Sequence, residues 1–125
     1  MTDLNTRAIG AEGEQKAVEF LINNNYTVLK TNFRVGRIGE IDIIAKDAEY
    51  ICFIEVKTRS SYTFGVPSQA VNFHKQQKIK QIASIYLSNT NSMDKCVRFD
   101  VVEIIIKNSN GVSSVEHINH IKNAF

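Results

Sequence analysis

The chain has 125 residues, of which 43% are hydrophobic and 22% charged, and its formal net charge is +2. These values are ordinary for one soluble globular domain spanning residues 1–125, and the small positive charge does not by itself indicate nucleic-acid binding. No apolar run approaches bilayer length and no export signal is evident, so we expect a cytoplasmic protein that does not enter a membrane.

The two cysteines do not suggest a disulfide framework or a metal knuckle. Cys52 and Cys96 both lie inside strand-like apolar runs. We therefore expect both to be small core residues in a reducing cytosol.

A first helix is predicted from about residue 6 to residue 23. Residues that recur at three- and four-residue steps would share one face: Gly10, Gly13, Glu14, Ala17, Val18 and Leu21. This spacing aims Glu14 at the sheet, although a glutamate at the margin of the stripe that reaches into water is an equal alternative. The two glycines indicate that another segment approaches the helix backbone closely.

Three strands follow, at about 26–34, 39–45 and 51–58, with a glycine turn at 35–37 between the first two. The last two would form an antiparallel hairpin with a turn near Asp47-Ala48-Glu49. An even loop, of two or four residues, places Asp42 opposite Glu55, with side chains roughly 4.5–5.5 Å apart at Cβ. An odd loop would send the two acids to opposite faces. We expect the four-residue loop from Asp47 to Tyr50, because the tight-turn signature Asn-Gly is missing.

The hairpin carries charges at the end of a buried strand. Glu55 and Lys57 are two residues apart, so they project from the same face, and Glu40 would lie opposite Lys57. Such charges are costly unless they are paired or serve a function. The alternative is a surface hairpin whose acids only neutralise Lys57.

A second helix is predicted from Ser68 or, after a short turn, from Asn72. Its apolar stripe contains Lys75, which would fall in the first turn if Asn72 is the N-cap. A lysine-rich helix is more often a solvated face, but the inward position of Lys75 argues against that reading. The polar loop from Thr58 to Gly65 precedes this helix and would form a wall of a ligand site.

Two final strands are predicted at about 95–106 and 112–118, the last one at an edge, with a turn ending in Asn-Gly between them. His117 and His120 have no partners at zinc-ligand spacing, so we expect surface or core histidines. Asp100 is expected to be structural, in a buried pair near Arg98. The element order predicts an α/β sandwich with an αβββαβ core around a mixed central sheet.

This arrangement resembles the restriction-endonuclease-like PD-(D/E)XK superfamily. Ile41-Asp42 stands where the motif has Pro-Asp, and Glu55-Val56-Lys57 matches (D/E)XK. Across almost the whole chain the sequence resembles the YraN family of bacterial endonuclease-like proteins. The further segments that carry this resemblance are Gly13-Glu14, Asn32-Phe33-Arg34, Gly39 to Ala45, Phe53 to Arg59, Val71 with Lys75, and Arg98 to Val102.

The resemblance implies a metal-dependent nuclease that hydrolyses phosphodiester bonds in DNA, with structure-selective action as one option. It implies Mg²⁺ or Mn²⁺ held by Asp42, Glu55 and the Val56 carbonyl, with Glu14 as an outer or second-metal ligand. Lys57 would orient the attacking water or stabilise the transition state.

Three basic residues are candidates for holding phosphates: Lys75, Arg59 and Arg34. The alternative is a non-catalytic module that binds nucleic acid or a protein partner on the same fold. The sequence leaves open whether two copies form a homodimer, which DNA structure is preferred, and what Glu40 does.

Overall fold

The computed structural model describes residues 3–60 and 71–125, with side chains from Glu12 onward. The elements, in chain order, are α1 (Asp3–Asn23), β1 (Thr27–Val35), β2 (Gly39–Asp47), β3 (Tyr50–Ser60), α2 (Phe73–Asn89), β4 (Cys96–Ser109) and β5 (Val112–Ile121). The five strands form one sheet in the order β1-β2-β3-β4-β5. The pair β3–β4 is parallel and the other three pairs are antiparallel, so the sheet is mixed as expected.

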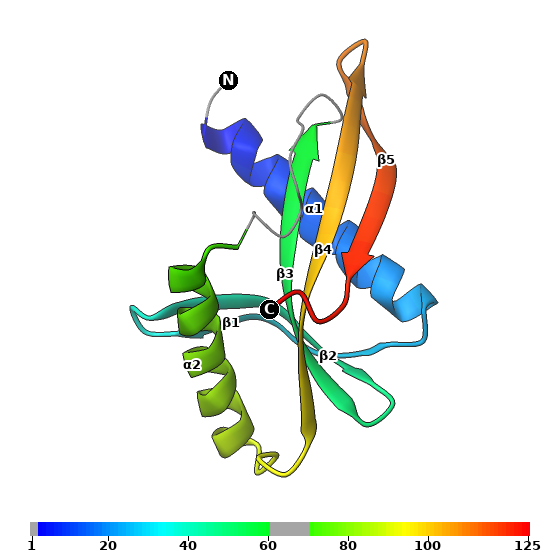
Figure 1. The fold of residues 1–125 in the computed structure, drawn as a ribbon. Coiled ribbons are helices and arrows are strands. Elements are labelled where there is room, and N and C mark those ends of the chain that lie inside the picture. Colours follow the sequence, from blue (N-terminus) through cyan, green and yellow to red (C-terminus); the bar gives the residue numbers. More distant parts are fainter. Residues whose placement is uncertain (1–2, 61–70) are drawn as a thin grey trace.

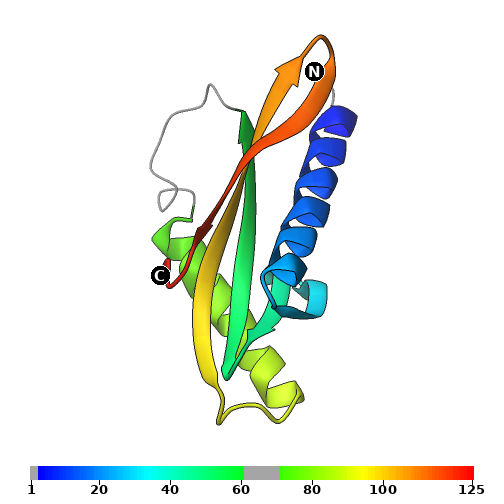
Figure 2. The same ribbon diagram turned by 90° about the vertical axis from the view of Figure 1, so that its right-hand side faces the viewer.

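The two helices cover opposite faces of the sheet (Figures 1 and 2). On the α1 face, Ala17 and Leu21 pack with Ile43 and Ile54 and are fully buried. The core on the α2 face has these residues: Ile41, Ile44, Phe53, Val71, Ile79, Ile82, Ala83 and Leu87. This α/β arrangement confirms the predicted fold class, in which helices on both faces shield the apolar strands.

The α1 helix approaches the sheet most closely at Gly13. A Cβ atom added at Gly13 would lie 2.1 Å from Thr58 Oγ1 on β3. A glycine is therefore required at this position, as the two glycines of the helix had suggested. The close approach brings the next residue, Glu14, toward the sheet.

The β2–β3 hairpin has the predicted register but not the expected loop. Asp47 pairs with Tyr50, so the turn consists only of Ala48 and Glu49, and the four-residue loop is wrong. Ala48 adopts a left-handed conformation at φ 53°, which closes the tight turn without Asn-Gly. Two and four residues give the same register, and Ile43 pairs with Ile54 as an even loop requires.

Of the two predicted starts of the second helix, the structure confirms the later one: α2 follows an Asn72 N-cap. The Asn72 side chain accepts a hydrogen bond of 2.9 Å from the Lys75 backbone N–H. The expected loop from Thr58 is partly wrong, because β3 continues through Ser60. The rest of that loop, residues 61–65, and the alternative helix start at Ser68 lie outside the described residues.

Two further expectations are corrected or refined. Cys52 is buried, but Cys96 is exposed at the first position of β4 and is not a core residue. The edge strand β5 extends to Ile121, three residues beyond its expected end. Within residues 3–60 and 71–125, no helix is long and apolar enough to cross a membrane.

Candidate active site

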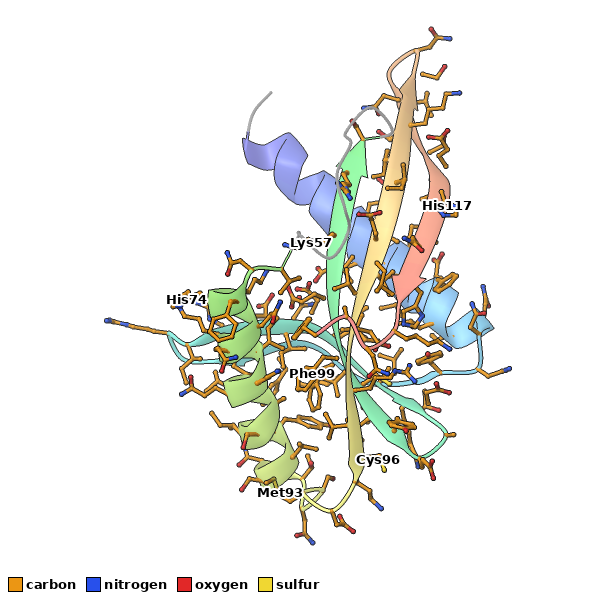
Figure 3. All side chains as sticks on the ribbon, in the orientation of Figure 1. Lys57, His74, Met93, Cys96, Phe99 and His117 are labelled. Carbon is orange, nitrogen blue, oxygen red and sulfur yellow. The ribbon has the colours of Figure 1, made fainter. Side chains whose placement is uncertain are left out.

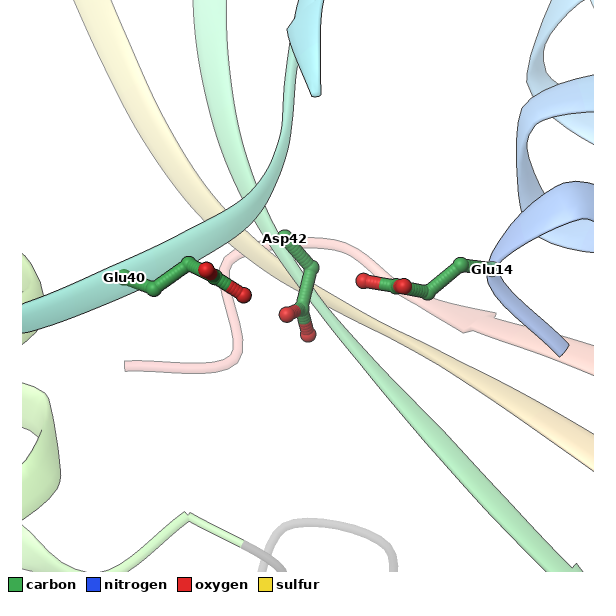
Figure 4. Close-up of side chains that lie close together, drawn as sticks. All are labelled: Glu14, Glu40 and Asp42. Atoms are coloured by element: carbon green, nitrogen blue, oxygen red, sulfur yellow. The ribbon is translucent and has the colours of Figure 1, made fainter. Parts of the chain in front are cut away.

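Three carboxylates from two elements converge beside the sheet. Glu14 of α1 and Glu40 and Asp42 of β2 each have a carboxylate oxygen within 4.8 Å of those of the other two, and all three side chains are half-buried. Figure 4 shows the three carboxylates pointing toward one another. Glu40 and Asp42 are two residues apart on one strand and so share a face, while the approach of α1 at Gly13 brings in Glu14.

Asp42 lies where β2 and β3 separate. The last pair of the ladder is Ile43 with Ile54, and beyond it the Val56 backbone N–H donates a 2.8 Å hydrogen bond to Asp42 Oδ2. The Asp42 side chain thus takes the place of a backbone acceptor and is held in one orientation. Figure 1 shows β2 turning away from β3 in this region.

Glu55 is the most buried acid of this region, with 2% of its surface exposed. Its Oε2 lies 2.8 Å from Lys75 Nζ, whereas its buried Oε1 has no hydrogen-bond partner among the described residues. Burial and the nearby Asp42 carboxylate raise the pKa of Glu55, and Lys75 and Lys57 only partly oppose this. A buried carboxylate oxygen without a partner is costly and is a ready position for a cation.

The two lysines are also coupled to this group. Burial and the neighbouring Lys75 ammonium lower the pKa of Lys57. For Lys75, burial disfavours the charged form, but the contact with Glu55 outweighs it and raises the pKa. Figure 3 shows Lys57 between β3 and the start of α2.

Glu14 shows the repulsion among these acids through its pKa. Burial, the Asp42 carboxylate and hydrogen bond, and the charges of Glu40 and Glu55 together raise the pKa of Glu14 to about 7. Repulsion among several acids at one position is typical of sites that bind a cation or act in proton transfer.

The structure therefore brings together the predicted Glu14, Asp42, Glu55 and Lys57 with Lys75. The predicted pairing of Asp42 with Glu55 is only partly realised. The closest acidic neighbours of Asp42 in the cluster are Glu14 and Glu40. The Glu55 carboxylate instead contacts Lys75. Glu40 was expected to face Lys57 and was not assigned a role. Its spacing of two residues from Asp42 was the signal that places both on one face.

The two arginines are placed differently. Arg59 makes an ion pair with the buried Glu103, with Nε at 2.6 Å and Nη2 at 2.5 Å from Glu103 Oε2. Arg34 is exposed on β1, and its register partner is Glu40. Arg34 thus lies on the same face as the acidic cluster, beside it.

These groups fit a hard divalent cation. The donors are carboxylate oxygens, which Mg²⁺ and Mn²⁺ prefer, and the site offers no thiolate or imidazole among its described residues. The unpartnered Glu55 Oε1 and the raised pKa of Glu14 indicate that the described residues balance the negative charge here only in part. The Val56 N–H is used by Asp42, and the role of the Val56 carbonyl stays a prediction.

The mixed sheet with one helix on each face, and acids at the point where its central strands part, defines a protein of the restriction-endonuclease-like class. A family model described as uncharacterised protein family UPF0102 matches residues 13–104. The chain belongs to this family, which is of the restriction-endonuclease-like type and to which the YraN resemblance refers.

Curated relatives support the membership over the full chain. A UPF0102 protein of Acetivibrio thermocellus is 51% identical over 97% of this chain and 93% of the relative. One from Caldicellulosiruptor bescii is 51% identical over 98% of this chain and 100% of the relative. One from Caldanaerobacter subterraneus subsp. tengcongensis is 43% identical over the whole of both chains.

Proposed function

We propose that this protein is a Mg²⁺- or Mn²⁺-dependent nuclease that hydrolyses phosphodiester bonds in DNA. The observation that carries the proposal is the convergence of Glu14, Glu40 and Asp42 within 4.8 Å of one another. Beside them lie the buried Glu55 and the amines of Lys57 and Lys75. A site made only to bind phosphate has little use for four neighbouring acids, because they repel it.

The acids would hold the cation. Asp42, fixed by the Val56 N–H, and Glu55, with its unpartnered oxygen, are the primary ligands in this proposal, with the Val56 carbonyl as a third. Glu14 and Glu40 would hold cation-bound water or a second cation. When bound, the cation supplies Lewis acidity and lowers the pKa of its water.

The lysines have separate roles. Lys57, with its lowered pKa, hydrogen-bonds and orients the attacking water or stabilises negative charge on the phosphoryl oxygens. Lys75 is 42% exposed, so its ammonium can contact both Glu55 and a phosphate that enters from solvent. Arg34, at the exposed side of the cluster, and Arg59, next to Lys57 in β3, would bind flanking phosphates.

We propose DNA as the partner, because the cations beside the acids, Lys57, Lys75 and Arg34, suit the phosphates of a nucleic-acid backbone. One site hydrolyses one strand in each event. A cut through both strands would therefore require a second copy of the chain, and nicked as opposed to linear products report whether such a homodimer acts.

A cleavage panel tests the proposal. Linear, nicked, flapped and four-way DNA are incubated with the purified protein and Mg²⁺ or Mn²⁺. We expect cleavage of at least one substrate, and a loss of about a hundredfold or more in Glu55→Gln and Lys57→Met. Glu116→Gln, on the exposed side of β5, is the matched control and retains activity.

Two outcomes would contradict the proposal as stated. Cleavage that survives both substitutions would exclude these residues as its catalytic groups. Salt-dependent binding of DNA without products under any cation would instead support the non-catalytic binding module.

A further inference from the structure

A small pocket lies next to the acidic cluster, on the side away from the lysines. Its volume is about 230 Å³ and it lies between α1 and β1. It shares Glu14 and Asp42 with the candidate active site but contains neither Lys57 nor Lys75. Its other polar groups are the amides of Gln15 and Asn32 and the hydroxyl of Thr31. Val18 is its partly exposed apolar residue, and the fully buried Ile43 lies behind it.

Asn32 occupies a special position in this pocket. Its neighbours Thr31 and Phe33 pair with Ile43 and Ile41, so Asn32 stands opposite Asp42 in the register. Asn32 has a left-handed backbone at φ 52° in the middle of a strand. Such a conformation costs about 1–3 kcal/mol and is concentrated at functional positions, and asparagine tolerates it better than most residues.

The donors and acceptors of the pocket differ from those of the active site. A carboxylate only accepts and an ammonium only donates, which suits cations and phosphates respectively. The amides of Gln15 and Asn32 both donate and accept. A nucleobase presents both kinds of group on one planar edge and an apolar face that can pack on Val18.

The size agrees with this ligand class. Sites for drug-sized molecules measure roughly 300–1,000 Å³, so a pocket of about 230 Å³ fits a smaller unit. A base that is stacked and paired inside a duplex cannot insert into such a pocket, because its hydrogen-bonding edge is covered by its partner.

We propose that the Gln15–Asn32 pocket binds one unpaired nucleobase beside the scissile phosphate. This inference rests on the proposed nuclease function and specifies its substrate: a nucleotide at a single-stranded end, a flap, a gap or a branch point. The phosphate of that nucleotide contacts the lysine side of Asp42, and the base enters between α1 and β1.

Nuclear magnetic resonance tests the pocket without any turnover. The ¹⁵N-labelled protein with Mg²⁺ is titrated with deoxyadenosine 5′-monophosphate and, in parallel, with 2-deoxyribose 5-phosphate. We expect the side-chain amide signals of Gln15 and Asn32 to shift with the nucleotide and to stay in place with the sugar phosphate. Equal shifts with both compounds, or shifts with neither, would overturn the inference.

A binding cycle gives a second test. A short single strand and the same strand with one central abasic site are bound to wild type and to the double variant Gln15→Ala/Asn32→Gly in Ca²⁺. Glycine suits the left-handed backbone, so the variant keeps its fold. We expect wild type to bind the abasic strand about threefold to tenfold more weakly, as one or two lost hydrogen bonds imply, and the double variant to show no difference.

Gln81→Ala, on the exposed side of α2, is the matched control and behaves as wild type. Failure of the two proposals is distinguishable. Base-dependent binding without cleavage would contradict the proposed nuclease activity but support the nucleobase site. If the protein cleaves DNA but binds the abasic strand as tightly as the intact strand, the nucleobase proposal alone is contradicted.

Discussion

Two groups of buried charges in this protein use the same residue types in opposite ways. At the far end of the sheet, Arg98 on β4 is 8% exposed and its guanidinium bonds Asp100, Asp47 and the Tyr26 hydroxyl. Asp100 also contacts His120 Nε2 at 2.8 Å and accepts a 3.1 Å hydrogen bond from the Asn123 backbone N–H. This group, the Arg98–Asp100 network, has a protein partner for each of these charges.

The pKa shifts separate the two groups. Burial alone would raise the pKa of Asp100, but the hydrogen bonds of His120, Arg98 and the Asn123 backbone outweigh it and lower the pKa. At the candidate active site the balance is reversed, and the pKa values of Glu55 and Glu14 are raised. A satisfied network stabilises the fold, whereas repulsion among neighbouring acids is typical of functional sites.

The largest expected effect is the difference in stability between two variants that each remove one acid, Asp100→Asn in the Arg98–Asp100 network and Asp42→Asn at the candidate active site. Asp100→Asn removes the buried carboxylate of the Arg98 pair and leaves only the partly exposed Asp47 as a charged partner. We therefore expect a loss of about 3–5 kcal/mol in the free energy of unfolding. In Asp42→Asn the amide oxygen still accepts from the Val56 N–H, and repulsion with Glu14 is removed. We expect this variant to be as stable as wild type in EDTA, by urea unfolding at pH 7.

Cation binding completes this experiment. Mg²⁺ should raise the thermal midpoint of wild type and not that of Asp42→Asn, because only the former retains the site. Asp94→Asn, exposed before β4, is the control and should match wild type in both measurements. Equal destabilisation by Asp42→Asn and Asp100→Asn would mean that the two groups do not differ.

Gly13→Ala is expected to move Glu14 away from Asp42 without replacing either acid. Gly13→Ala would gain about 1 kcal/mol in an ordinary helix. Here the new Cβ meets Thr58 Oγ1, so we expect a net loss of about 1–3 kcal/mol in the free energy of unfolding and weaker Mg²⁺ binding, as α1 moves Glu14 away from Asp42.

Relief of the clash is the control for this change. Thr58→Ala removes the hydroxyl that the new Cβ would meet, so Gly13→Ala/Thr58→Ala should recover most of both losses. A Gly13→Ala protein with unchanged stability and Mg²⁺ affinity would show that the close approach does not position the cluster.

Local patterns predicted the fold and most of the residues at the site. The period of α1 placed Glu14 on the sheet side, and the even loop fixed the face shared by Asp42 and Glu55. The N-cap at Asn72 placed Lys75 in the first turn of α2. Each of these follows from spacing along the chain, which helices and strands convert directly into direction.

What the sequence did not predict depends on contacts between distant elements. Cross-strand reasoning paired Glu40 with Lys57, but β2 pairs with β3 only from Ile43 onward. Glu40 lies before that paired segment and joins Glu14 instead. Arg59 pairs with Glu103, 44 residues further along, because β3 and β4 are parallel neighbours. The separation of strands and the pairing of remote side chains have no signature within either segment.

The smallest expected effect is a difference in pH dependence between the two groups. A carboxyl whose pKa is raised on folding binds its proton more tightly in the folded state, so its contribution is lost as the pH rises. For Glu14, with a pKa of about 7, the free energy of unfolding in EDTA should decline between about pH 4.5 and pH 7. Asp100, with a lowered pKa, acts in the opposite direction and weakens the fold only below about pH 4.

Glu14→Gln isolates the contribution of the active site to that curve. The glutamine cannot ionise, so the decline from pH 4.5 to 7 should shrink by about 1 kcal/mol, a modest value because water screens a half-buried carboxylate. Saturating Mg²⁺ should flatten the wild-type curve in the same range, since the cation compensates the ionised acids. Glu12→Gln, exposed on α1, leaves the curve unchanged. A Glu14→Gln curve with the wild-type slope would place the repulsion elsewhere and remove the contrast between the acidic cluster and the Arg98–Asp100 network.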